Sequence, residues 1–185
     1  MIDSLVTILL SLFLLFLVGF LLLVLSSSLF HLKHMVPFVP TPASVIQAMI
    51  TEANLQSGML VFDLGAGDGR ILRRAMRRVP GIRAVGYEGA FGVWLLAKFL
   101  NMLSAAKPEM KMEDFFTKNF SDADVIFTYL SIDIMQKLLP KLQSELKPGA
   151  KVISNTFSFK QKEPQKKVFV KMPFWGGTNV LVYQF

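Results

Sequence analysis

The chain contains no cysteine, and this absence excludes disulfide bridges, cysteine-ligated metal sites and thiol nucleophiles. It has no internal repeat and no low-complexity tract, so a repeat array is excluded as well. Positive charge is missing from the N-terminus, because all 20 Lys and Arg residues follow position 32. The chain has 185 residues, 52% hydrophobic content and a net charge of +7. This length is sufficient for one domain, and the domain is preceded by an N-terminal segment of different composition.

That segment is uncharged from Leu5 to Leu25. As a helix, its roughly 21 residues would span about 30 Å, the thickness of the hydrocarbon core of a bilayer. The sequence therefore predicts a transmembrane anchor over residues 1–30. A cleaved signal peptide stays open as an alternative because Ser26-Ser27-Ser28 resembles a cleavage site, although the start carries Asp3 and no basic residue.

The charges that follow the apolar segment begin at Lys33, beside His31 and His34. Basic residues flanking a membrane segment favour the cytoplasmic side. We therefore expect a single-pass membrane protein whose soluble domain faces the cytoplasm. The two histidines lack a neighbouring carboxylate, so interfacial side chains are favoured over a metal site, and no metal is expected.

The most informative stretch of the chain is Val61-Phe62-Asp63-Leu64-Gly65-Ala66-Gly67-Asp68-Gly69-Arg70. It has the pattern of a buried strand that enters a glycine-rich turn and opens a helix, where backbone N–H groups can approach a ligand. A dinucleotide-binding loop has the spacing G-x-G-x-x-G. Here acidic residues accompany the glycines, and carboxylates suit a cationic ligand better than a pyrophosphate.

A second acid, Glu88, ends the predicted strand at residues 82–88, about 20 residues after the glycines. A carboxylate at this place can accept hydrogen bonds from both ribose hydroxyls of an adenosine. A tight turn alone would explain the glycines but not the two acids at Asp63 and Glu88, and binding of NAD is the weaker alternative.

Downstream the chain alternates between strands and helices. Strands are predicted at residues 59–64, 82–88, 109–113, 125–129 and 151–157, and helices at residues 42–55, 70–79, 91–103 and 132–146. This order predicts an α/β fold with a parallel sheet covered by helices on both faces. Residues 166–172 and 178–185 alternate without a helix between them and predict a C-terminal antiparallel hairpin.

These motifs resemble the class I S-adenosylmethionine-dependent methyltransferases, which have a Rossmann-like sheet closed by such a hairpin. The connector Pro37-Phe38-Val39-Pro40-Thr41-Pro42 and the apolar N-terminus are similar to one group, the membrane-anchored protein lysine methyltransferases that act on adenine nucleotide translocase and on the c-type subunit of ATP synthase, with their prokaryotic relatives. The resemblance covers nearly the whole chain. It implies an anchor at 1–30, a connector at 31–41 and a methyltransferase domain at 42–185.

The resemblance also implies S-adenosylmethionine as cofactor, and as partners the lipid bilayer and a membrane-protein substrate methylated on lysine. One departure is Gly89-Ala90-Phe91-Gly92 after Glu88, where the group continues with an Asn-Pro type sequence, so the known lysine substrates do not transfer. A small-molecule or lipid methyltransferase stays open, as does an inactive cofactor-binding scaffold.

Cofactor contacts follow from the resemblance. The loop residues Gly65, Ala66, Gly67 and Gly69 shape the site, Asp63 and Asp68 lie near the cationic methionine end, and Glu88 holds the ribose. Asp114 and Phe115 would contact adenine, although capping of a helix explains Asp114 equally well. Thr41 would close over the methionine carboxylate, or simply cap the helix that begins at Pro42.

On the acceptor side, Tyr129 ends the fourth strand and is the candidate to line a lysine channel, with Ser131 and Asp133 as polar partners. A plain core role for Tyr129 and a helix-starting role for Asp133 are the alternatives. Enzymes that methylate DNA bases carry Asn or Asp-Pro-Pro-aromatic after this strand, whereas this chain has Thr128-Tyr129-Leu130-Ser131. A nucleic-acid substrate is therefore not expected.

Five arginines crowd the predicted helix at residues 70–79, namely Arg70, Arg73, Arg74, Arg77 and Arg78. A solvated outer face is the simplest interpretation. Contact with anionic lipid headgroups and phosphate binding are the alternatives.

Overall fold

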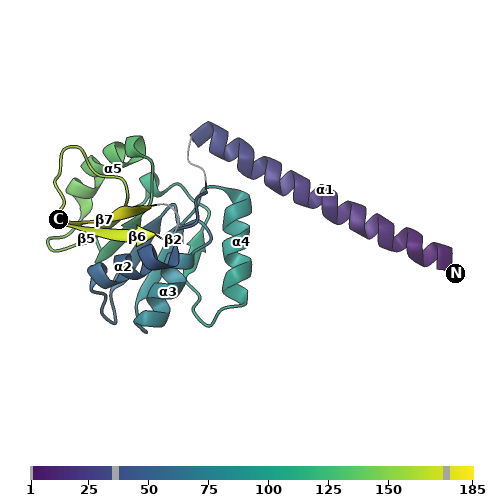
Figure 1. Cartoon of the computed structure of the whole chain (residues 1–185), viewed down its shortest axis with the longest axis horizontal. Helices are drawn as coiled ribbons and strands as arrows, with labels where there is room; N and C mark the ends of the chain where they lie inside the picture. Colours follow the sequence, from purple (N-terminus) through teal and green to yellow (C-terminus); the bar gives the residue numbers. More distant parts are fainter. Residues whose placement is uncertain (1, 35–37, 173–175) are drawn as a thin grey trace.

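The chain forms a Rossmann-like α/β domain preceded by one long helix, as a computed structural model shows (Figure 1). The structure describes residues 2–34, 38–172 and 176–185. Part of the predicted connector, residues 35–37, and part of the hairpin loop, residues 173–175, lie outside the described residues.

Seven strands make one sheet in the order β3-β2-β1-β4-β5-β7-β6. The strands are β1 (Leu60–Leu64), β2 (Arg83–Tyr87), β3 (Glu109–Lys111), β4 (Val125–Thr128), β5 (Lys151–Asn155), β6 (Lys166–Met172) and β7 (Gly176–Gln184). The first five pair in parallel, whereas β7 runs antiparallel to both β5 and β6. The predicted parallel sheet with its closing hairpin is confirmed.

Helices cover both faces of this sheet. On one face, α2 (Ala43–Ala53) and α3 (Arg70–Arg78) bury their apolar residues against β1, β4 and β5. On the other, α5 (Ile132–Glu145) buries Met135, Leu138 and Leu142. The central strands β1, β2, β4 and β5 are almost fully buried because both faces of the sheet are covered there. This burial is the main force that holds the domain together.

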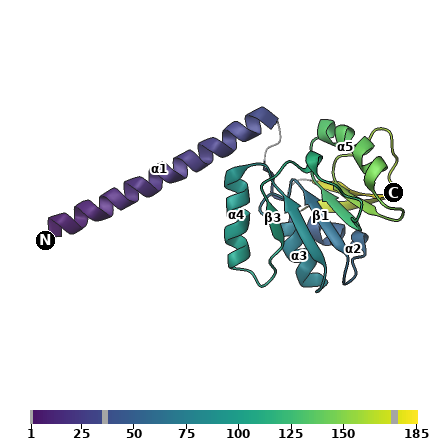
Figure 2. The same ribbon diagram turned by 180° about the vertical axis from the view of Figure 1, so that it is seen from behind.

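The β2–β3 edge of the sheet is bordered by α4 (Phe91–Met102), which contacts β3 and also the long N-terminal helix. A short 3-10 helix, η1 (Phe115–Thr117), follows β3. In both views α4 forms the edge of the domain on the side from which the N-terminal helix extends (Figures 1 and 2).

The N-terminal helix α1 (Ile2–His34) is 33 residues long. Its side chains are described at positions 6–22 and 25, and the large apolar ones among them are exposed, from 40% for Leu17 to 70% for Leu15 and Phe16. Within the described part of the chain, no helical segment combines the length and the apolar character that a membrane span requires. The anchor stays a prediction.

Candidate functional site

A cavity of about 570 Å³ lies where the parallel strands end, the place at which open α/β sheets bind ligands. Ten of the twelve predicted site residues line it: Thr41, Asp63, Gly65, Ala66, Gly67, Asp68, Glu88, Asp114, Phe115 and Tyr129. Gly69 lies just behind the loop as the residue that starts α3. Asp133 is exposed in the first turn of α5 and does not line the cavity.

The turn after β1 needs its glycines because of the backbone they adopt. Gly65 and Gly67 have φ values of 74° and 58°, in the left-handed region that other residues rarely occupy. A Cβ on Gly67 would come within 2.6 Å of Cε2 of Phe38. The loop therefore packs directly against the segment that connects α1 to the domain.

Asp63 is a buried carboxyl group of the site with an oxygen atom that has no hydrogen-bond partner. Its side chain is 1% exposed, lines the cavity, and has an Oδ2 atom without a hydrogen-bond partner. Burial, then the charges of Glu88 and Asp68, raise its pKa from 3.8 to about 8. Because a buried carboxylate without a partner is costly, this position favours a ligand that brings a positive charge or a hydrogen-bond donor.

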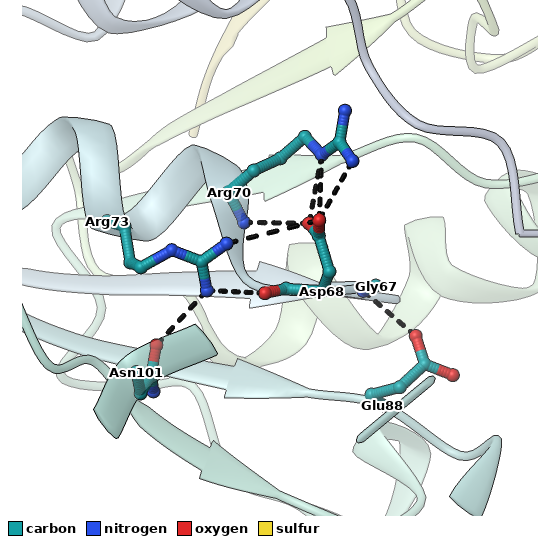
Figure 3. A network of polar contacts seen from close by, with 6 residues as sticks. All are labelled: Gly67, Asp68, Arg70, Arg73, Glu88 and Asn101. Carbon is teal, nitrogen blue, oxygen red and sulfur yellow. Dashed lines mark hydrogen bonds and ion pairs between the residues drawn. The ribbon is translucent and has the colours of Figure 1, made fainter. Parts of the chain in front are cut away.

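Glu88 holds the glycine loop and the start of α4 together. One carboxylate oxygen accepts a hydrogen bond from the Gly67 N–H at 2.9 Å, which Figure 3 shows. The other accepts a hydrogen bond from the Ala90 N–H at 2.8 Å. These two hydrogen bonds hold the carboxylate at the cavity wall.

Asp68 has a different environment from Asp63. Its carboxylate accepts hydrogen bonds from the Arg70 guanidinium at 2.8–3.1 Å and lies 3.9 Å from Nη2 of Arg73. Figure 3 shows both arginines converging on it. The carboxylate of Asp68 thus has partners inside the protein, whereas Oδ2 of Asp63 has none.

Arg73 also corrects the prediction of a shared arginine face. Its residue is only 7% exposed, and Nη1 donates to the backbone oxygen of Asp68 at 2.5 Å and to Oδ1 of Asn101 at 3.1 Å. Asn101 in turn donates to the Pro108 carbonyl at 2.8 Å. The sequence could not reveal that this arginine points inward and ties α3 to α4.

Thr41 and Asp114 were each predicted either to cap a helix or to contact the cofactor, and the structure tests the capping roles. The N-cap of α2 is Pro42, without a side-chain cap, so the capping role for Thr41 is wrong, and Thr41 is instead buried at the cavity. Asp114 caps the 3-10 turn, since its Oδ1 accepts a hydrogen bond from the Phe116 N–H at 2.9 Å. It also lines the cavity, and its contact with adenine stays a prediction.

An apolar part of the wall surrounds Tyr129. Its ring stacks on that of Phe157 with centroids 6.1 Å apart, and Ser131, Leu130 and Ile134 complete this side. Phe157 follows β5 after Thr156, whose φ of 68° turns the chain sharply. Phe38 belongs to the connector motif, but no sequence pattern predicted that Phe38 or Phe157 would line the cavity. The neighbouring carboxyl ends of β4 and β5 bring Phe157 to Tyr129.

These residues fit S-adenosylmethionine. The unpaired carboxyl of Asp63 suits an ammonium group, Glu88 suits ribose hydroxyls, and the Asp114–Phe115 pair suits an adenine. Among the described residues, no cluster of His, Cys, Asp and Glu could hold a metal ion.

Comparison with known proteins agrees with this geometry. The ANTKMT methyltransferase domain model matches residues 63–166. A protein-lysine N-methyltransferase from Saccharolobus islandicus is 32% identical over 81% of this chain and 92% of its own length. The mouse adenine nucleotide translocase lysine N-methyltransferase is 30% identical over 72% of this chain, and the human lysine N-methyltransferase of the ATP synthase c-subunit is 30% identical over 69% of it. The chain spans only 58% and 54% of these two relatives.

Solved structures extend the likeness. The structure of an RNA methyltransferase from Salinibacter ruber with S-adenosyl-L-homocysteine has a TM-score of 0.73 and 32% identity, over 79% of this chain and 93% of that one. TrmN from Thermus thermophilus has a TM-score of 0.65 at 16% identity, covering 76% of this chain and 48% of that one, and shares the fold alone.

Proposed function

The chain belongs to the ANTKMT methyltransferase domain family of S-adenosylmethionine-dependent protein-lysine methyltransferases, and from that membership we propose that it methylates a lysine of a membrane-associated protein. The observation that carries the proposal is one cavity lined both by the buried, unpaired carboxyl of Asp63 and by the aromatic wall of Tyr129 and Phe157. The first suits the methyl donor, and the second suits an acceptor lysine.

Each residue has a proposed part in holding the donor. Asp63 binds the ammonium group of the methionine portion, Thr41 closes over its carboxylate, and Glu88 accepts the ribose hydroxyls. Asp114 and Phe115 contact the adenine. The glycine loop lets the backbone approach the ligand, while Asp68, neutralised by Arg70, fixes the shape of the loop.

When bound, the cofactor supplies an electrophilic methyl group on a sulfonium. The chain's own task is to align a nucleophilic amine with that methyl and to exclude water. Only the neutral amine of lysine is a nucleophile, and an apolar environment lowers the pKa of an amine. Tyr129, Phe157 and Ile134 provide such a wall, so a lysine entering along it would lose its proton more readily.

We also propose that α1 anchors the protein in a membrane as a single-pass helix, with the catalytic domain on the cytoplasmic side. The uncharged run of the sequence, the exposed apolar side chains described in α1 and the first basic residue at Lys33 support this. Such an anchor would hold the cavity within reach of lysines at the membrane surface.

Isothermal titration with S-adenosylmethionine tests the donor site. We expect the full chain to bind, and the Glu88→Ala variant to bind at least about tenfold more weakly. The variant loses a ligand contact and the hydrogen bonds from the Gly67 and Ala90 N–H groups. Glu109→Ala is the matched control, since Glu109 is an exposed acid on β3 outside the cavity. If the folded protein does not bind, the enzyme assignment of its cavity fails.

Radiolabelled cofactor and a membrane fraction then identify the acceptor class. Label in a protein band that disappears with Glu88→Ala supports lysine methylation. Label in the lipid extract would identify a lipid enzyme, and label in RNA would give the chain the substrate class of the Salinibacter RNA methyltransferase. Cofactor binding without any transfer would favour a scaffold.

A further inference from the structure

The outer face of α4 is apolar and uncovered. Six large apolar side chains on and just after this helix are between 42% and 75% exposed with α1 in place: Phe91, Leu95, Leu96, Phe99, Met102 and Leu103. Their spacing puts them on one side of the helix, opposite the buried Val93, Ala97 and Asn101. A helix with an apolar outer face, in addition to the face packed on its domain, normally has a second apolar neighbour.

From this we propose that α4 lies in the plane of a membrane surface, with its outer face among the lipid headgroups and upper acyl chains. The inference rests on the proposed function, because it takes α1 as the anchor. It adds a second membrane contact within the catalytic domain and names the surface that makes it.

Lipid is favoured over a soluble partner by the position of α4. The helix contacts α1, so an anchored α1 holds α4 next to the bilayer. Figures 1 and 2 show α4 running across the direction of α1 at the edge of the domain on the α1 side. A helix beside the anchor and across its direction lies along a membrane surface, as interfacial helices do.

The polar groups around α4 have the character of an interface. Lys98 is its sole charged residue, and Nζ lies 5.9 Å from the ring centroid of Trp94. Exposed Lys107 follows nearby in the chain. Lysines at the border of an apolar face extend their amines towards anionic headgroups. The indole N–H of Trp94 donates a hydrogen bond to the Met110 carbonyl at 3.1 Å inside the protein.

This contact would also orient the cavity. The start of α4 is tied to the site, because Glu88 accepts the Ala90 N–H at 2.8 Å and Gly89 lines the cavity. Resting α4 on the membrane would therefore keep the donor site at a fixed height and tilt, so that lysines close to the headgroups are reached.

The chain's lack of cysteine makes a direct test possible. Single variants Phe99→Cys and Leu103→Cys, each in the full chain, carry a spin label. The matched control is Gln143→Cys, at an exposed position of α5. The protein is reconstituted in vesicles of phosphatidylcholine with phosphatidylglycerol. Flotation reports the anchor, titration with S-adenosylmethionine reports the donor site, and spin-label accessibility to oxygen and to a water-soluble nickel chelate reports the surroundings of each position.

We expect labels at positions 99 and 103 to be more accessible to oxygen than to nickel, and the label at 143 to show the reverse. If the protein floats but position 99 is as accessible to nickel as position 143, the α4 inference is overturned while the anchor stands. Protection of position 99 from both reagents would mean that protein covers the face, a second copy included, and would also overturn it. Failure to float overturns the anchor as well, and lost cofactor binding with a lipid-embedded label overturns only the enzyme proposal.

Discussion

At the scale of single residues, Asp63 connects cofactor binding to protons. With its pKa raised to about 8 by burial and by the nearby carboxylates, its side chain is protonated in the empty protein at about pH 6.5. A cation bound beside it lowers that pKa and releases the proton. We expect release of about one proton per cofactor bound at this pH, and an affinity that rises by up to about tenfold per pH unit below the pKa. Titration in two buffers of different ionisation enthalpy measures the release.

The Asp63→Asn variant is the control for this linkage. This variant has no carboxyl proton to release at position 63. Its affinity for S-adenosylmethionine should therefore be lower than that of the unchanged protein and should not vary with pH over the same range. The stability of the empty protein should change with pH in the opposite direction, falling as pH rises. Because folding raises the pKa of the Asp63 carboxyl, its contribution to stability is fully present below the unfolded pKa of 3.8 and is lost as pH rises through about 8. Equal proton release from both proteins would show that Asp63 does not meet the cation.

At the scale of elements, the glycine loop and the connector depend on each other. Gly67→Ala places a methyl group where Cε2 of Phe38 lies 2.6 Å away, and forces a non-glycine residue to a φ of 58°. We expect a loss of stability greater than the roughly 1 kcal/mol of backbone strain alone, and a cofactor affinity at least about tenfold lower, because the Gly67 N–H that Glu88 accepts would shift. Chemical denaturation and calorimetric titration measure the two effects.

Gly58→Ala separates strain from collision. Gly58 has a φ of 88° but nothing within 4 Å of its added Cβ, so it should show the strain without the loss of binding. Adding Phe38→Ala to Gly67→Ala should restore part of the affinity. If the two alanine variants behave alike, contact with the connector is unimportant.

The secondary structure was largely predictable from the sequence because periodicity and turn residues are local signals. The strand at residues 166–172 was predicted with the bounds it has, whereas the third strand ends at Lys111 rather than at residue 113, since Asp114 begins a 3-10 turn. The glycines and acids of the donor site lie in one contiguous motif, residues 61–70, and at the end of the neighbouring strand β2. Their roles are predictable from the sequence because this motif is a local signal.

What escaped prediction depends on contacts between distant segments. Phe38 reaches the glycine loop from the connector, and Phe157 reaches Tyr129 only because β4 and β5 are neighbours. The inward turn of Arg73 required knowledge of Asn101, 28 residues away. Asp133 is close to Tyr129 in the sequence, but it is exposed on the first turn of α5 and does not line the cavity. A helix that starts there sends successive side chains in different directions.

At the scale of the whole molecule, the folding and cofactor binding of the catalytic domain should not depend on α1. Both large apolar clusters are built from residues between 45 and 185, and the lining of the cavity starts at Phe38. A variant lacking residues 1–34 should therefore keep its fold, and its cofactor affinity should stay within about threefold of the full chain, since distant sites act nearly independently.

Transfer to a membrane-embedded acceptor should respond differently to the same deletion. A tether raises the effective concentration of the enzyme at its substrate, with gains on the order of 10²–10⁴, so we expect the rate with vesicle-embedded acceptor to fall by about 10². The same acceptor in detergent micelles is the control, because there the full chain has no shared bilayer to exploit and both forms should act at similar rates. Equal rates on vesicles would refute the anchor as a targeting device, whereas equal loss in vesicles and micelles would mean that α1 contributes to the acceptor site itself. Measuring both media with S-adenosylmethionine in excess therefore distinguishes tethering from a direct catalytic role of the N-terminal helix.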